Sequence, residues 1–373
     1  MFLSQTRLPH LLPPRAYFAA EQYERERSAL LTPAWHAVAT VDELERPGDF
    51  VTRDLFGTAV HVRNFDGELR ALSNVCAHRH CLITGERCGN SARMTCQYHG
   101  WEYGPDGKTG RIPEPKNFVP FADGGERIPR YRLETCGRVV FVCLSDDEPG
   151  LAEFLGEYHE IIARRCGAGT KEFLRMDVEY AANWKVPVEN SLEAYHVPSV
   201  HPNTFREDPT DARSTHLLRE RSTAFGSALP FSPHSRVDRV FQRGEAAVVA
   251  WLGGAPTREY WQHHVFPNLL LSFTDAVSLV HSVIPTGPTT SYAVVRQFGT
   301  MGSAQRGPRR WLGVAWGKLK GAMTRQIMSE DLALIPHIQA GLERSPNAGL
   351  LGRCEERIHA FQAHVASRAG SGE

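Results

Sequence analysis

Short alternations of apolar and polar residues dominate the first part of the chain, which is the pattern of β-strands with one buried face. Turn dipeptides such as Pro47–Gly48 and Asp66–Gly67 separate several of these runs, as expected between antiparallel strands. The runs occupy residues 35–40, 49–53, 58–63, 131–133 and 138–144. We therefore predict a small all-β domain over residues 35–146.

The segment before this domain has a different pattern. Residues 1–15 are rich in proline, and residues 17–31 have the period of a short amphipathic helix that ends at Thr32–Pro33. We expect residues 1–34 to form an N-terminal arm and helix.

From residue 147 to residue 373 the pattern predicts an α+β domain. A helix over residues 151–165 leads into a strand over 171–180, and the polar stretch 205–245 is expected to form loops that cover a pocket. Strand-like runs then precede two helical stretches, which predicts an antiparallel sheet with helices on one side. The strand-like runs are 246–252, 260–266, 268–274, 277–284 and 291–299, and the helical stretches are 310–337 and 352–367.

The charges of the chain balance, because 42 Lys and Arg face 42 Asp and Glu among 373 residues. This balance predicts neither a nucleic-acid surface nor an acidic tail. The eight cysteines follow no disulfide-framework spacing, which favours a reducing compartment. We find no apolar run of signal-peptide or membrane-spanning length, so we expect a cytoplasmic protein without a membrane partner.

Two short motifs in the β region pair a cysteine with a histidine. They are Cys76-Ala-His78-Arg and Cys96-Gln-Tyr-His99-Gly-Trp. In a Rieske [2Fe–2S] centre two cysteines hold one iron and two histidines hold the other. A structural zinc site is the alternative, since Cys₂His₂ is also a zinc set, but zinc fingers usually place like ligands together. The mixed pairs therefore favour the cluster and leave zinc open.

A second group of candidate ligands lies in the α+β domain. Glu193 and His196 are three residues apart and would share one face of a helix. Pro198 is expected to end that helix, so that His201 turns back toward His196. Two imidazoles and one carboxylate form the facial triad of non-haem Fe(II) oxygenases, which leaves coordination positions open for O₂. A histidine pair held by surface hydrogen bonds is the other interpretation.

The carboxylate of such a triad must come from elsewhere in the chain. Asp331, on a predicted C-terminal helix, is the best candidate. Its neighbour Glu330 is expected to point off a different side of the same helix. A Glu–Asp pair on a helix is also typical of a solvated face.

Taken in order, these motifs resemble the oxygenase α-subunit of Rieske non-haem iron oxygenases over nearly the whole chain. The resemblance includes Asn183-Trp-Lys before the histidine pair and Phe-Pro-Asn at 266–268. It implies a START-like, helix-grip catalytic domain. It also implies a Rieske cluster on Cys76, His78, Cys96 and His99, and a mononuclear iron on His196, His201 and Asp331.

The same resemblance implies an assembly. Glu193 stands where the family has an acidic residue that bridges two metal centres. It would link His99 of a neighbouring subunit to His196, which implies a ring-shaped homo-oligomer, most simply a homotrimer.

The chain departs from the family pattern at two positions. His80 stands where family members mostly have glycine, and Glu193 stands where they mostly have aspartate. In having glutamate at this position, the chain resembles oxygenases that act on quaternary ammonium compounds such as carnitine. Hydroxylation of an aromatic ring is the alternative activity. A START-like ligand-binding protein with structural zinc and no redox activity is the third hypothesis.

The expected reaction is oxygen insertion into a C–H bond of a small substrate, with loss of an alkyl group when the carbon bears nitrogen. The chain has no Gly-x-Gly-x-x-Gly loop and no ferredoxin-type cysteine spacing, so a separate flavin and iron–sulfur reductase fed by NAD(P)H is implied. Aromatic residues on the predicted strands could cage a cation or pack in the core. They are Trp251, Tyr260, Trp261, Phe266 and Phe273.

Overall fold

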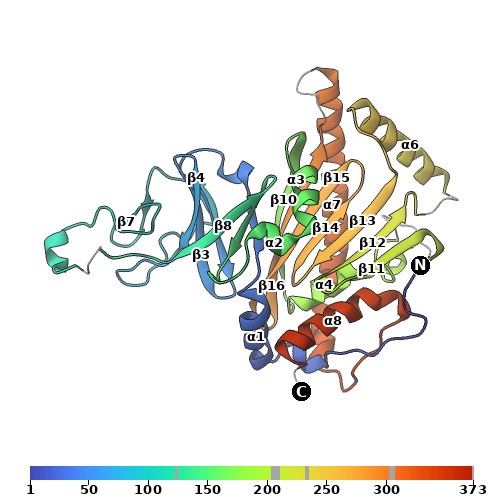
Figure 1. Cartoon of the computed structure of the whole chain (residues 1–373), viewed down its shortest axis with the longest axis horizontal. Coiled ribbons are helices and arrows are strands. Elements are labelled where there is room, and N and C mark those ends of the chain that lie inside the picture. Colours follow the sequence, from blue (N-terminus) through green and yellow to red (C-terminus); the bar gives the residue numbers. More distant parts are fainter. Residues whose placement is uncertain (122–124, 203–210, 232–234, 302–306, 372–373) are drawn as a thin grey trace. The chain divides into compact units, whose positions relative to one another are not determined.

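The computed structural model describes residues 1–121, 125–202, 211–231, 235–301 and 307–371. The chain forms two compact units, coloured along the sequence in Figure 1. One unit comprises residues 32–156, and the other joins residues 1–31 to residues 157–373. The mixed helix-and-sheet class predicted from the sequence is confirmed.

The unit of residues 32–156 is built on a seven-stranded antiparallel sheet with the order β1-β9-β8-β4-β3-β2-β5, joined by a small β6-β7 hairpin. Val51, Val60, Val62 and Phe141 are fully buried. The strands are β1 (His36–Thr40), β2 (Asp49–Leu55), β3 (Thr58–Phe65), β4 (Glu68–Ser73), β5 (Cys88–Asn90), β6 (Met94–Thr95), β7 (Glu102–Tyr103), β8 (Arg130–Cys136) and β9 (Val139–Cys143). The predicted all-β texture is thus present.

The second unit contains another seven-stranded antiparallel sheet, in the order β10-β16-β15-β14-β13-β12-β11. Helix α7 runs along this sheet and packs on β10 and β16, while α8 lies beside α1 and β12 (Figure 1). The strands are β10 (Thr170–Tyr180), β11 (Ser214–Leu218), β12 (Ser222–Ala228), β13 (Glu259–Val265), β14 (Leu269–Phe273), β15 (Val277–Gly287) and β16 (Thr290–Thr300). This sheet and its helices form the unit that contains the second group of candidate ligands.

The helices are mostly short, apart from α6, α7 and α8. They are α1 (Ala20–Glu26), α2 (Leu151–Leu155), α3 (Glu157–Arg165), α4 (Lys185–Leu192), α5 (Val197–Val200), α6 (Arg236–Trp251), α7 (Pro308–Leu342) and α8 (Glu356–Ala369). The predicted helix at 151–165 is interrupted at Gly156, whose φ of +53° lies in the left-handed region. Among the described residues, no helix has both the length and the apolar character needed to cross a bilayer.

The predicted loops at 205–245 and the predicted strand at 246–252 are wrong where the structure describes them. Strands β11 and β12 and the helix α6 occupy most of this region, while residues 203–210 and 232–234 lie outside the described residues. The apolar run at 246–251 is the last part of α6, which begins behind an N-cap at Ser235. A short apolar run fits either element, and its alanines favour the helix.

Buried polar contacts fix helix α4, which leads to the candidate iron ligands. Lys185 and Glu26 are both fully buried, and the ammonium donates to both carboxylate oxygens at 2.7 and 2.8 Å. The indole Nε1 of Trp184 donates to the same carboxylate at 2.8 Å. Asn183 is tied to α7, because its backbone N–H donates to the side chain of Gln339 on that helix at 2.9 Å. The N-terminal helix and α7 thus hold the start of α4 in position.

Candidate functional site

Two similar loops carry the cysteine–histidine motifs in the unit of residues 32–156. In each loop the backbone N–H four residues after the cysteine donates to the cysteine carbonyl, at 3.1 Å for His80 and 3.0 Å for Gly100. Both closing residues have positive φ, +58° at His80 and +71° at Gly100. The turn therefore needs a left-handed residue at this position, and glycine adopts that conformation with little strain. Here His80 adopts it instead.

The loops bring the four predicted cluster ligands together. The Cys76 and Cys96 thiols are each 2 % exposed and close enough to interact, and the His78 and His99 ring centroids lie 4.7 Å apart. The His78 ring stacks on Trp101 at 4.9 Å, whereas His99 is exposed. Nδ1 of His78 is buried and has no hydrogen-bond partner among the described residues. An unpartnered ring nitrogen beside two buried thiols suits a group bound through nitrogen and sulfur.

Tyr103 also contacts this site, although no sequence motif indicated it. Its hydroxyl lies 3.0 Å from Sγ of Cys76 and accepts the backbone N–H of Ala77 at 3.0 Å. Burial and the neighbouring Cys76 thiol raise the pKa of Tyr103, so the hydroxyl keeps its proton and can donate to the sulfur.

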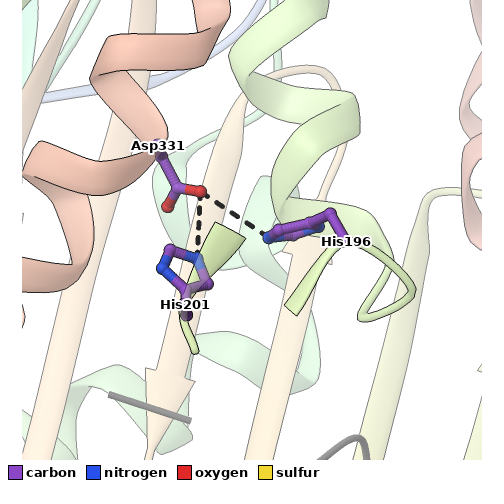
Figure 2. Close-up of side chains that lie close together, drawn as sticks. All are labelled: His196, His201 and Asp331. Carbon is purple, nitrogen blue, oxygen red and sulfur yellow. Dashed lines mark ion pairs between the residues drawn. The ribbon is translucent and has the colours of Figure 1, made fainter. Parts of the chain in front are cut away.

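The second ligand set gathers in the unit of residues 157–373. His196 precedes α5, His201 follows it, and Asp331 projects from α7 (Figure 2). Oδ1 of Asp331 lies 3.1 Å from Nε2 of His201 and 3.6 Å from Nε2 of His196. The three ligand atoms lie within 4.8 Å of one another, so one metal ion could contact all three.

The local structure around these histidines differs from the prediction. Helix α4 ends at Leu192, and Glu193 is extended, so Glu193 and His196 do not share a helix face. Their contact comes from a turn, in which the backbone N–H of His196 donates to Glu193 at 3.0 Å. Pro198 lies in the first turn of α5 and starts that helix rather than ending one, because proline lacks only an N–H that has no partner there.

Each histidine has a second carboxylate on its other ring nitrogen. Nδ1 of His196 contacts Glu193, and Nδ1 of His201 lies 2.7 Å from Oε2 of Glu330. The sequence did not predict this contact of Glu330, which was expected only to point off a different side of the helix from Asp331. Consecutive helix residues differ in direction, but the two nitrogens of one imidazole also face different sides, so Asp331 and Glu330 both reach His201. A carboxylate on Nδ1 directs Nε2 toward the metal position.

The carboxylates set the charge of the site. Burial lowers the pKa of His196, but the Glu193 hydrogen bond and the Glu193 and Asp331 charges outweigh burial and hold that pKa above its ordinary value. Burial also lowers the pKa of His201, but the hydrogen bonds and charges of Asp331 and Glu330 outweigh burial and hold that pKa above its ordinary value. Three acids around two imidazoles favour a positive charge between them, which is what a divalent cation would supply. The donor set fits Fe(II).

A cavity of about 560 Å³ opens onto these three ligands. Of the five aromatic residues for which a cation cage or core packing was expected, only Tyr260 lines it. Residues alternate across a strand, so Trp261 points to the opposite face of β13 and stacks on His263 at 5.8 Å. Other aromatic rings that line the cavity are Phe2, Tyr180, Tyr195, Phe225, Phe231 and Phe241.

Residues 34–132 match the Rieske [2Fe–2S] domain, and residues 168–371 match the catalytic domain of the ring hydroxylating alpha subunit. The chain is 31 % identical over 194 residues to the carnitine monooxygenase oxygenase subunit of Acinetobacter pittii, covering 51 % of this chain and 52 % of that protein. It is 31 % identical over 191 residues to the toluate 1,2-dioxygenase subunit alpha of Pseudomonas putida, covering 48 % and 42 %.

Among solved structures, the chain is similar to the quaternary ammonium Rieske monooxygenase CntA. The TM-score is 0.75 at 22 % identity, with 96 % of this chain and 95 % of that chain covered. The likeness supports the predicted fold in both units. The chain spans about half the length of the curated relatives it matches.

Proposed function

Because the chain belongs to the family of Rieske-type ring-hydroxylating oxygenase α subunits, we propose that it is the terminal oxygenase of a multicomponent system. It would use O₂ to hydroxylate, and in some substrates to dealkylate, a small organic molecule. The observation that carries the proposal is the convergence of two imidazoles and one carboxylate on a cavity of about 560 Å³.

The residues at the cavity have separate roles. His196, His201 and Asp331 would hold Fe(II), which supplies O₂ activation when it is bound. Glu193 and Glu330 would orient the two imidazoles through their Nδ1 atoms and keep each Nε2 directed at the metal position. The apolar and aromatic walls would exclude bulk water from the reacting carbon.

Electrons would enter through the other unit. Cys76, His78, Cys96 and His99 would hold a [2Fe–2S] cluster, which supplies single electrons when it is bound. The match to a Rieske domain favours this cluster over structural zinc, whereas the unpartnered Nδ1 of His78 would suit either group. A separate reductase with flavin and an iron–sulfur centre would deliver electrons from NAD(P)H.

We propose a homotrimer, or a multiple of one, in which electrons pass between neighbouring copies. The exposed position of His99 supports a contact there, and Glu193 would bridge it to His196 of the next copy. The solved structure of a similar quaternary ammonium Rieske monooxygenase is described as revealing insights into inter-subunit electron transfer.

A quaternary amine is the substrate class that we propose first. The relatives and the structural neighbour named for carnitine or quaternary ammonium compounds support it. Aromatic rings attract a quaternary ammonium group through their faces. The cavity offers Phe225 and Phe231, whose ring centroids lie 6.2 and 5.6 Å from that of Tyr260.

Ring hydroxylation of an aromatic compound is the second candidate. The toluate dioxygenase relative favours it, and the same aromatic walls would pack against a planar ring.

A single-turnover experiment tests the proposal. Protein with a reduced cluster and Fe(II) is exposed to O₂ with a panel of quaternary amines and simple aromatic compounds, and products are analysed by mass spectrometry. Oxygenated or dealkylated amines would support the first candidate, and oxygenated aromatics alone would support the second. A colourless protein that binds zinc and oxidises neither set would refute the oxygenase function.

A further inference from the structure

A buried cation in the wall of the cavity has no counter-ion among the described residues. Arg357, on α8, is 3 % exposed and lines the cavity that also contains the candidate iron ligands. Its Nε donates to Thr223 at 3.2 Å and its Nη1 to Gln262 at 2.8 Å, both neutral partners. Nη2 is buried and makes no hydrogen bond within the described part of the chain. A buried guanidinium without an anion is costly, and a buried donor without an acceptor is rare.

Neighbouring acids do not neutralise this arginine. Glu356, the residue before it, is turned to the N-terminal segment, where it accepts the backbone N–H groups of Leu3 and Ser4 at 3.1 and 2.7 Å. Lys320, another cation that lines the cavity, already has its acid, because its ammonium lies 2.5 Å from Glu245. Arg357 is therefore the lining cation whose charge a ligand could neutralise.

Among the described residues, no acidic side chain forms an ion pair with Arg357. Burial lowers the pKa of His216 to about 4, although the Glu356 carboxylate, 3.7 Å from its Nδ1, raises it, so this lining imidazole is neutral. Its two nitrogens have no hydrogen-bond partner among the described residues. Burial also lowers the pKa of Arg357 itself to about 10. The guanidinium stays charged near neutral pH, and a bound anion would offset its desolvation.

We propose that Arg357 binds a carboxylate group of the substrate and so restricts the oxygenase to organic carboxylates. A guanidinium has donors spaced for the two oxygens of a carboxylate, and one unpaired positive charge matches a monoanion better than a phosphate. The inference rests on the proposed function, since it names a property of the substrate. A quaternary amine substrate would then be a zwitterion, with its ammonium group against the aromatic walls and its carboxylate bound to Arg357.

Paired ligands test the inference on the wild-type holoprotein. Each pair is an acid and its primary amide, which is similar in size but neutral: γ-butyrobetaine and its amide, and toluate and toluamide. Dissociation constants are measured without O₂ by calorimetry, and oxidation is measured separately in single turnovers. We expect the acid of at least one pair to bind about 10- to 100-fold more tightly than its amide, which is the range for a hydrogen bond to a charged group.

Variants assign the preference to the arginine. Arg357→Met keeps the length and apolar stem, and should bind acid and amide equally, with KM raised and kcat little changed because the contact is remote from the reacting carbon. Arg357→Lys retains the charge and should keep part of the preference. Arg368→Met is the matched control, since Arg368 lies on the same helix and is exposed, and it should bind like wild type.

The outcomes separate this inference from the proposed function. Equal binding of acids and amides by wild type overturns the inference even if Arg357→Met fails to fold, and the oxygenase stands if products form. A preference for acids that survives Arg357→Met also overturns it. Arginine-dependent binding of acids without any oxidation would support the anion site and refute the oxygenase.

Discussion

Removing the charge of Glu330 tests whether this carboxylate supports the candidate iron site through its contact with His201. Glu330 approaches Nδ1 of His201 to 2.7 Å, while Nε2 of the same ring faces Asp331 at 3.1 Å. Glu330→Gln keeps an oxygen that can accept the Nδ1 proton but removes the negative charge, and Glu330→Ala removes both. The pair of variants therefore separates orientation from charge.

The magnitude follows from the environment of the carboxylate. Carboxylate partners of metal-bound histidines typically contribute about 10- to 100-fold to metal affinity, or roughly 1.4–2.7 kcal/mol. The Glu330 side chain is 19 % exposed, so solvent screens part of its charge. We expect Fe(II) affinity to fall about 10-fold in Glu330→Gln and toward 100-fold in Glu330→Ala.

The effect should depend on pH in a defined direction. Burial lowers the pKa of His201, and Asp331 and Glu330 together raise it above 6.5. Iron and protons compete for the imidazole, and Glu330→Gln lowers that pKa, so protons compete less in the variant. The gap in iron affinity between wild type and variant should be largest near pH 8 and should narrow as pH falls through 6.5.

The assay is anaerobic competition for Fe(II) with a chromogenic chelator, while cluster absorbance reports on the other unit. Glu343→Gln is the control, because it makes the same chemical change at the end of the same helix. Wild-type iron affinity in both Glu330 variants at pH 8 would refute the role given to Glu330.

Three further results are expected. Glu193→Gln, with iron supplied in excess, should fill both metal sites yet lose most product formation; normal turnover would show that Glu193 does not bridge the centres. His80→Gly should raise the free energy of unfolding by up to about 1 kcal/mol, and Gly100→Ala should lower it by about 1 kcal/mol, because both positions have positive φ; urea titrations that show opposite signs would contradict this account. Burial lowers the pKa of His264 to about 3 and of His281 to about 4, so below pH 6.5 the unfolded chain binds protons at these histidines while the folded protein does not. The free energy of unfolding should therefore fall by about 1.4 kcal/mol per pH unit for each histidine until the pH reaches those pKa values. Urea titrations at pH 7, 6 and 5 that show constant stability would refute this prediction.

The sequence predicted regular elements well where one period dominates. Strand β10 was expected at 171–180 and occupies Thr170–Tyr180, because its alternation extends over many residues. The prediction failed at α6, where a short apolar run fits either a strand or the last turns of a helix. The pattern from residue 236 onward favours the helix, so a window longer than the apolar run itself is needed to predict this element correctly.

Cavity-lining residues were harder to predict than metal ligands. Strand alternation shows that Tyr260 and Trp261 point to opposite faces, but it does not show which face bears the cavity. Only the packing of helices against the sheet decides that, and it places Tyr260 in the cavity wall and Trp261 on the other face.

The sequence by itself determined the residue types and the local spacing of the candidate ligands, since cysteine, histidine and turn residues act within a few positions of one another. Tertiary structure decided which distant groups complete each site. Glu330 reaches His201 across 129 positions of sequence, and Arg357 reaches Gln262 across 95. Such contacts depend on how α7 and α8 pack on the sheet. No local sequence pattern shows whether a charged side chain that becomes buried will have a counter-ion in the folded protein.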